Sequence, residues 1–531
     1  MGAARVVGCS WGLLCLLGWG TTATAGTGGP VLVKAGQLLD VRTGILHAKQ
    51  ALLIENERIK EVGPEAQILA HAPSGAQLID LGGYTVLPGF IDAHTHLTYR
   101  VDVASYAWLG VSAPREALLG ARHAKATLMA GFTTVRNLGA RGYADVALRD
   151  AIRDGDVLGP RMQVSGPAIG STGGHMDSNL LPYAFRYSEE GIADGREGVI
   201  RKVREVVKYG SEVVKVAVTG GFLSVGTNPN VGQYSDEELQ ALVAESKRLG
   251  KPVAAHAHGT VGIKQAVRAG VDSIEHGTEL DDECIQLMKS RGTYLVPTVF
   301  LWSHFPENAR PPEVPQEKAE KAREMAPSAK RNLAKAVKAG VKIAFGTDSS
   351  VYPHGMNGHE FGALVELGMS PLGSIQAATL HAADLLRWSD RVGELKPGLY
   401  ADLVAVPSNP LLNVRILENI PFVMKGGEVV KDQRPSATCT PHATSSFAAP
   451  QEDGTLRTHG PTGVSLLPAV RRLWATFRGA VDARAAASVW LDDTGDVDGA
   501  IGIYGWPGAG QPDRWSACTH SEAASPCVCT G

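Results

Sequence analysis

The sequence predicts an α/β fold: a (β/α)₈ barrel of the TIM type, with a small β-sandwich-like domain built from both flanks of the barrel. Two observations lead to this prediction. Eight short apolar runs alternate with amphipathic segments through the middle of the chain, as repeated βα units require. Further short strands with turns between them precede and follow that region. A doubly wound open sheet is the alternative, but no Gly-rich phosphate loop follows the first strand.

Composition narrows the class of protein. Hydrophobic residues make up 44% of the 531 residues and charged residues 20%, which excludes a mostly disordered chain and a multi-span membrane protein. The 51 Lys and Arg against 54 Asp and Glu give a net charge of -3, so no basic field is present for nucleic acid. We therefore expect a small-molecule or dipeptide substrate and no nucleic-acid partner. A homo-oligomer remains open.

Residues 1–25 have the pattern of an export signal. Arg5 precedes a short apolar run, and Ala23-Thr24-Ala25 provides a small-x-small cleavage site. The run is shorter than the roughly 20 residues that a membrane span needs, so we expect no stable span after cleavage. A periplasmic or secreted location follows. Val6-Val7-Gly8-Cys9 resembles a lipoprotein box, but almost no hydrophobic segment precedes it, which favours ordinary cleavage over lipidation.

The barrel is assigned to residues 85–391. Its predicted strands are Thr85–Ile91, Phe132–Arg136, Arg161–Ser165, Val213–Val218, Pro252–Ala255, Val271–Ile274, Tyr294–Val296 and Lys342–Phe345. The segments between them have helical periodicity, and Ser235 followed by Glu238 predicts a capping box at one helix start. Most of these helices are followed by a glycine and then by the next strand, which is typical of short αβ loops.

The flanks form the second part of the prediction. Residues 31–84 and 392–432 are expected to build the small β domain together, since the two ends of a barrel can meet on one side. Residues 433–531 are rich in Ala, Gly, Ser, Thr and Pro and show no domain. They are expected to be a low-complexity, disordered extension, or else an aberrant reading of a GC-rich coding region.

Metal-competent side chains occur where the predicted strands end, which is where a barrel places its active site. His94 and His96 close the first strand and point the same way, because side chains alternate along a strand. Lys215 lies inside an apolar strand, where a charge is costly unless it is modified or paired. The remaining candidates, at the ends of the fifth, sixth and eighth strands, are His256, His258, His276 and Asp348.

Each of these residues has an ordinary structural explanation when it is taken alone. A lone histidine can be a hydrogen-bonded core residue, Lys215 can be an ion-paired core residue, and Asp348 can be a helix N-cap. Five such features at the same end of five strands are hard to attribute to chance. Together they predict a metal site.

The same residues resemble the amidohydrolase superfamily. The resemblance rests on the segment from Gly89 to His96, on Lys215, His256, His276 and Asp348, and on Asp402-Leu403-Val404 and Val423–Gly427 in the flanking domain. It implies two divalent metal ions, usually zinc, and a Lys215 carboxylated by carbon dioxide that bridges them. His94, His96 and Asp348 would hold one ion, and His256 and His276 the other.

Further stretches resemble a group within the superfamily that includes Xaa-Pro dipeptidases, carboxypeptidase-like enzymes and ochratoxin-degrading amidases. They include Gly173-Gly174-His175 and Ala254–Gly259. The resemblance implies that His258 contacts the substrate carbonyl and that Asp348 passes a proton from a metal-bridged hydroxide to the leaving amine. His175 is expected to bind the substrate carboxylate, and Tyr234 to line the pocket.

Three functions therefore compete. The first is a metal-dependent hydrolase of an amide or peptide bond in a dipeptide, an Xaa-Pro substrate or an N-acyl amino acid. The second is a hydrolase of lactones, phosphotriesters or cyclic amides at the same dinuclear site. The third is a non-catalytic binding barrel, which is disfavoured because none of the expected metal ligands is missing from the sequence.

Overall fold

The computed structural model describes residues 29–99, 107–179, 181–308 and 316–435, together with 486–487 and 503–504. The chain divides into two units, Met1–Ser436 and Ala437–Gly531. The predicted signal in residues 1–25 lies outside the described residues, as does most of the predicted tail. In the second unit, β15 (Ala486–Ala487) pairs antiparallel with β16 (Ile503–Tyr504). No helix among the described residues is both long enough and apolar enough to cross a membrane.

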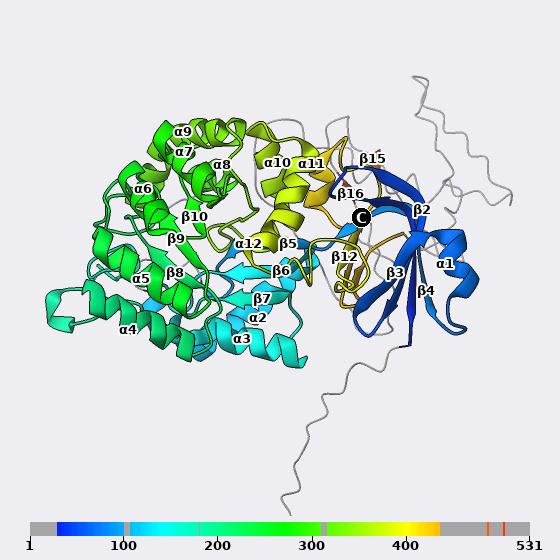
Figure 1. Cartoon of the computed structure of the whole chain (residues 1–531), viewed down its shortest axis with the longest axis horizontal. Coiled ribbons are helices and arrows are strands. Elements are labelled where there is room, and N and C mark those ends of the chain that lie inside the picture. Colours follow the sequence, from blue (N-terminus) through cyan, green and yellow to red (C-terminus); the bar gives the residue numbers. More distant parts are fainter. Residues whose placement is uncertain are drawn as a thin grey trace, which may run out of the picture. The chain divides into compact units, whose positions relative to one another are not determined.

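A seven-stranded mixed sheet joins the two flanks of the first unit, and its blue and orange strands lie together in Figure 1. In sheet order its strands are β14 (Glu428–Asp432), β13 (Phe422–Lys425), β12 (Leu403–Val406), β4 (Gln77–Pro88), β1 (Val31–Leu39), β2 (Leu46–Glu55) and β3 (Arg58–Pro64). The link between the flanks is the antiparallel pairing of β4 with β12, in which Pro88 lies opposite Leu403. The strands thus pair in one continuous sheet and not as two separate ones.

Two parallel sheets form the other part of the unit. One contains β5 (Phe90–Thr95), β6 (Phe132–Asn137) and β7 (Arg161–Val164), and the other contains β8 (Val214–Ala217), β9 (Val253–Ala257), β10 (Ser273–His276) and β11 (Tyr294–Val296). Backbone hydrogen bonds connect their edges on both sides. On one side Glu212 N donates to Val164 O at 2.8 Å; on the other, segment 342–345 bonds to both β11 and β5.

Two predicted strands differ from the structure. The predicted strand Thr85–Ile91 is divided between two sheets: its first residues end β4, and Phe90 begins β5. Gly89 lies at this junction, where a Cβ atom would come within 2.2 Å of the Thr133 hydroxyl. The predicted strand Lys342–Phe345 is present only as an isolated parallel bridge between Ile343 and Leu295.

The helices of the described chain lie between the strands and, for the last five, between β11 and β12. They are α1 (Glu65–His71), α2 (Ala113–Met129), α3 (Ala144–Asp154), α4 (Gly195–Lys208), α5 (Asp236–Arg248), α6 (Thr260–Ala269), α7 (Asp282–Arg291), α8 (Leu301–Asn308), α9 (Gln316–Lys338), α10 (His359–Glu366), α11 (Pro371–Gln376) and α12 (Ala382–Leu385), with shorter turns η1 (Ala107–Gly110), η2 (Arg141–Tyr143), η3 (Tyr183–Phe185), η4 (Ala377–His381) and η5 (Val414–Glu418). The predicted capping box is confirmed, because Ser235 and Glu238 each bond the other's backbone N–H.

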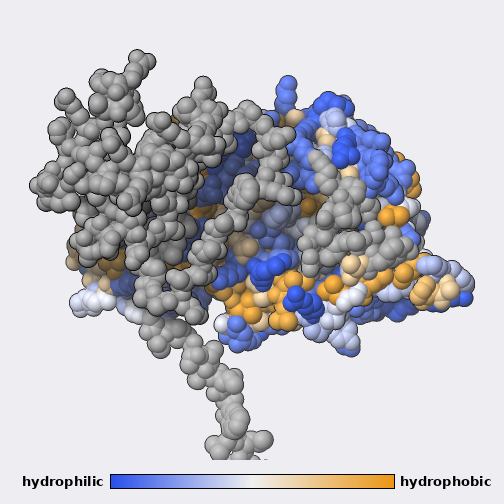
Figure 2. All heavy atoms as spheres, turned by 180° about the vertical axis from the view of Figure 1, so that it is seen from behind, coloured by the Kyte–Doolittle hydropathy of each residue, from blue (hydrophilic) through white to orange (hydrophobic). Residues whose placement is uncertain are grey.

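The surface is mixed in character. In Figure 2 hydrophilic side chains cover much of the upper right of the described surface, and apolar ones gather in a band along its lower edge. Large apolar residues such as Leu412, Tyr183 and Phe185 are exposed on the described chain. Scattered exposure of this kind is normal in soluble proteins and does not by itself mark an interface.

Candidate metal centre

The end of β5 brings His94 and His96 close to the carboxylate of Asp348. Asp348 follows the eighth predicted strand, Lys342–Phe345. His96 Nε2 lies 3.1 Å from Asp348 Oδ1, and His94 Nε2 lies 3.5 Å from the same oxygen. The buried Asp92 carboxylate fixes this arrangement. It accepts hydrogen bonds from the His94 amide at 3.1 Å, from the Thr347 hydroxyl at 2.6 Å and from Asn357 Nδ2 at 2.8 Å. Asp92 thus joins β5 to the loop that carries Asp348.

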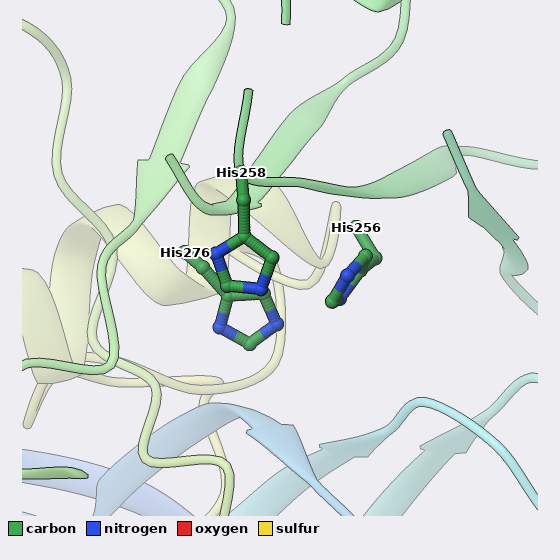
Figure 3. Close-up of side chains that lie close together, drawn as sticks. All are labelled: His256, His258 and His276. Carbon is green, nitrogen blue, oxygen red and sulfur yellow. The ribbon is translucent and has the colours of Figure 1, made fainter. Parts of the chain in front are cut away.

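A second group of histidines lies at the ends of β9 and β10 (Figure 3). The rings of His258 and His276 stack with centroids 4.9 Å apart, and the His256 ring meets His276 edge-on at 4.8 Å. Threonine hydroxyls hold the Nδ1 atoms of two of these rings: Thr298 lies 2.9 Å from His276, and Thr278 lies 3.0 Å from His258. The Nε2 atoms of these two rings therefore remain available.

The buried histidines are in the form that coordinates a metal. Burial lowers the pKa of His94 to about 4 and that of His258 to about 3, and it holds the pKa values of His256 and His276 well below their usual range. Neutral imidazoles are metal ligands. Three buried nitrogens have no hydrogen-bond partner among the described residues: His94 Nε2, His96 Nδ1 and His258 Nε2. A divalent metal ion would satisfy such orphaned nitrogens, so the residues fit the ions that the resemblance implies.

The ligand atoms fall into two groups: His94, His96 and Asp348 form one, and His256, His258 and His276 the other. Within each group they lie no more than 4.8 Å apart. Lys215, 1% exposed on β8, lines the same cavity as members of both groups. Its burial lowers its pKa to about 8, against the opposing charges of Glu275 and Asp348. The amine is therefore far more easily deprotonated than an ordinary lysine.

Two of these residues have a strained backbone. His276 has φ of 71° and Asp348 has φ of 59°, both in the left-handed region that non-glycine residues seldom adopt. Such strain collects at functional sites, where the surrounding structure holds it. At Asp348 the amide donates to His94 O at 2.7 Å, which fixes the strained turn against β5.

A charged pair that was not predicted from the sequence lies behind His94. Glu275 accepts from Arg136 Nη2 at 2.9 Å and contacts His94 Nδ1 at 2.8 Å, and all three side chains are almost completely buried. A carboxylate can only accept, so Nδ1 carries the proton and the lone pair of Nε2 faces Asp348. Burial acts to raise the pKa of Glu275, but Arg136 and His94 outweigh it and hold that pKa low.

We expect Glu275→Gln to weaken metal binding by about 10–100-fold, as is typical when the partner of a ligating histidine is lost. The amide can donate to His94 Nδ1 and so favour the tautomer whose Nε2 cannot coordinate. The measurement is metal content by elemental analysis under competition from a chelator. Ser273→Ala is the matched control, because Ser273 bonds the same carboxylate at 2.5 Å without contacting His94. Equal loss in both variants would contradict a specific role for the His94 contact.

A cavity of about 310 Å³ opens over both ligand groups. His175 lines it: its ring stacks on His256 at 4.1 Å, and its Nδ1 lies 2.9 Å from the Ser224 hydroxyl. The described residues that line the cavity do not include His258 or Tyr234. His258 is fully buried beside His276, and the Tyr234 hydroxyl donates to Ala193 O at 2.9 Å. The Tyr234 hydroxyl is thus bonded within the core, and the expected pocket position of Tyr234 stays a prediction.

Comparison with known proteins gives consistent results. The model of the amidohydrolase family matches residues 85–431. An ochratoxinase of Aspergillus niger is 34% identical over 409 residues, which cover 72% of this chain and 82% of the relative. Among solved structures, a Xaa-Pro dipeptidase with bound methionine in the active site is 37% identical with a TM-score of 0.72, and the match covers 76% of this chain and 100% of that one. The structure of the A. niger ochratoxinase is 31% identical with a TM-score of 0.67, covering 76% and 96%.

Proposed function

Because the chain belongs to the amidohydrolase family and is a metal-dependent hydrolase of amide or peptide bonds, we propose that its substrate is a dipeptide, an Xaa-Pro dipeptide or an N-acyl amino acid. The observation that carries this proposal is a cavity of about 310 Å³ directly over two groups of metal ligands. That volume suits a small substrate. The similarity to proteins named a Xaa-Pro dipeptidase and an ochratoxinase supports the same substrate class.

We further propose that the two ligand groups hold two zinc ions. His94, His96 and Asp348 would hold one, and His256 and His276 the other, with a carbamate on Lys215 between them. Two such ions, when bound, lower the pKa of water and polarise a carbonyl. The lowered pKa of Lys215 supports the carbamate, because only the neutral amine adds to carbon dioxide, forming an N–C bond and releasing one proton.

Asp348 is proposed to move the proton. Burial acts to raise the pKa of its carboxyl, but His94 and His96 hold that pKa below its usual value, so the group is ionised near neutral pH and can accept a proton. Its oxygen would take the proton of the attacking water and deliver it to the leaving amine. His175 is proposed to orient the substrate from the cavity wall. Because His258 is buried, we propose that it supports the metal ligands next to it and does not contact the substrate directly.

We infer that the two parallel sheets are the two arcs of a (β/α)₈ barrel. The backbone hydrogen bonds at both pairs of sheet edges support this, as does the likeness to the Xaa-Pro dipeptidase structure. In such a barrel the strand ends that carry His94, Lys215, His256 and His276 form one face. This shared face explains why residues far apart in sequence line one cavity.

The proposed substrate class is tested with a panel of dipeptides, N-acyl amino acids, lactones and phosphotriesters, assayed with zinc-loaded protein. We expect the highest kcat/KM on a C–N bond of a dipeptide or an N-acyl amino acid, loss of that activity with a chelator, and recovery on adding zinc. A higher kcat/KM on a lactone or a phosphotriester would overturn the proposed class. Elemental analysis should find two metal ions per chain.

For location, we propose that residues 1–25 direct export to the periplasm or the medium. Expression in a bacterial host followed by fractionation and N-terminal sequencing tests this. A mature chain beginning after Ala25 in the exported fraction is expected. Recovery of uncleaved chain in the cytosol alone would contradict it.

A further inference from the structure

Among the residues that the structure describes, one lysine in the cavity wall has no partner and is not one of the candidate metal ligands. Lys318, in the first turn of α9, lines the cavity. Within the described parts of the chain, its ammonium makes no hydrogen bond and no ion pair, although partial burial lowers its pKa. A cation that has lost part of its hydration without gaining an anion is unfavourable in the free protein. A bound anion would remove this cost.

The other cavity cations are already occupied. Arg141 is paired with the Glu116 carboxylate and lies over the Trp108 ring at 4.4 Å. Lys215 belongs to the metal centre. On α9 itself, Lys321 pairs with Glu317 at 2.9 Å. Lys318 is therefore the cavity-lining cation left free for a ligand among the described residues.

The helix that carries Lys318 is tied to the loop that carries the partner of His175. Lys321 Nζ donates to the carbonyls of Ser224 and Thr227, each at 3.3 Å, and the Ser224 hydroxyl bonds His175. Lys318, His175 and Ser224 all line the cavity. Phe222 and Phe305 line the same cavity with ring centroids 5.4 Å apart, so an apolar surface accompanies the cation.

We propose that Lys318 binds a carboxylate of the substrate and is a specificity-determining residue for free acids. This inference rests on the proposed function. An amino-acid carboxylate that entered the cavity without such a partner would bind the two metal ions in competition with the scissile group and would inhibit the enzyme. A cation on the wall gives it a separate place, and the neighbouring phenylalanines can pack against an apolar side chain. His175 can add only a single ring nitrogen, because Ser224 already holds its Nδ1.

The test measures binding, so it does not depend on turnover. L-methionine and L-methioninamide are titrated into zinc-loaded protein by calorimetry, using wild type, Lys318→Met, Lys318→Arg and Lys338→Met. Lys338 lies exposed at the far end of the same helix and serves as the matched control. We expect wild type to prefer the free acid at least tenfold. Lys318→Met should lose that preference, and Lys318→Arg and Lys338→Met should keep it. Metal content should be equal in all four proteins.

Two results would overturn the inference. One is equal affinity of the wild type for the acid and the amide. The other is an acid preference that survives in Lys318→Met, which would place the carboxylate on the metals or on His175. Failure of the proposed function is seen separately, as absence of C–N hydrolysis across the substrate panel. The acid preference and its dependence on Lys318 are measured whether or not that hydrolysis is found.

Discussion

Replacing Lys215 with alanine should lower kcat by about 10³-fold or more, because charge stabilisation by a correctly held metal pair is worth several kcal/mol and each 1.4 kcal/mol is tenfold in rate. Lys215 is 1% exposed and lines the same cavity as members of both ligand groups, so its loss removes the only group proposed to reach both ions. Metal content measured by elemental analysis should fall together with turnover.

Short carboxylates should partly restore the Lys215→Ala enzyme. Propionate can enter the space left by the side chain and supply the two oxygens of the proposed carbamate. Sodium chloride at the same ionic strength is the control, and circular dichroism shows whether the variant is folded. A folded Lys215→Ala enzyme with wild-type turnover and two metal ions would contradict the bridging role.

Arg136→Met should lower the free energy of unfolding by about 3–5 kcal/mol, since removing one partner of a buried ion pair leaves an uncompensated charge. Arg136 and Glu275 are both 0% exposed, and the guanidinium also donates to Ala93 O at 2.6 Å. Urea unfolding of the metal-free protein measures the change without a contribution from bound ions.

Two further variants separate the charge from the packing of Arg136. Arg136→Met combined with Glu275→Met should recover part of the lost stability, because no unpaired charge remains in the core. Arg136→Lys keeps the charge but loses the planar guanidinium. Its free energy of unfolding should lie between those of wild type and Arg136→Met. A loss below about 1 kcal/mol in Arg136→Met would show that the pair is not important for folding.

Strand alternation and strand ends predicted most of the side chains that the structure brings together in the two groups of candidate metal ligands. His94 lies in β5 and His96 directly after its end, and both approach Asp348. Lys215 is a charge in an apolar strand. The same criterion applies to Arg136, a charge on β6 that is as fully buried as Lys215 on β8, although β6 also carries two threonines and an asparagine. Glu275 lies next to His276 in the sequence. The strand that its carboxylate faces depends on how the neighbouring strands are arranged, and the local sequence does not specify that arrangement.

Residues outside the strands were harder to predict. Lys318 lies in a helix rich in Lys and Glu, and nothing in that pattern distinguishes it from Lys321 one turn later. The packing of α9 distinguishes the two: within the described chain, Lys321 bonds the carbonyls of Ser224 and Thr227, and Lys318 has no partner. The predicted strand Lys342–Phe345 also depends on contacts that the local sequence does not specify. After this segment the Thr347 amide donates to the Asp92 carboxylate, and the Asp348 amide donates to a carbonyl of β5. The regular hydrogen-bond ladder of a strand therefore does not continue.

The pairing of β4 with β12 has a consequence for how the chain is made. About 300 residues separate Pro88 from its partner Leu403, and at about 5–20 residues per second a ribosome needs roughly 15–60 s to supply them. During that interval β1 to β4 can assemble, but the β4 edge with its apolar Val86 and Leu87 has no neighbour. An open edge of this kind recruits strands from other chains. Nascent chains of this enzyme should therefore depend on a chaperone until the last strands emerge, and a slowed ribosome should increase their aggregation.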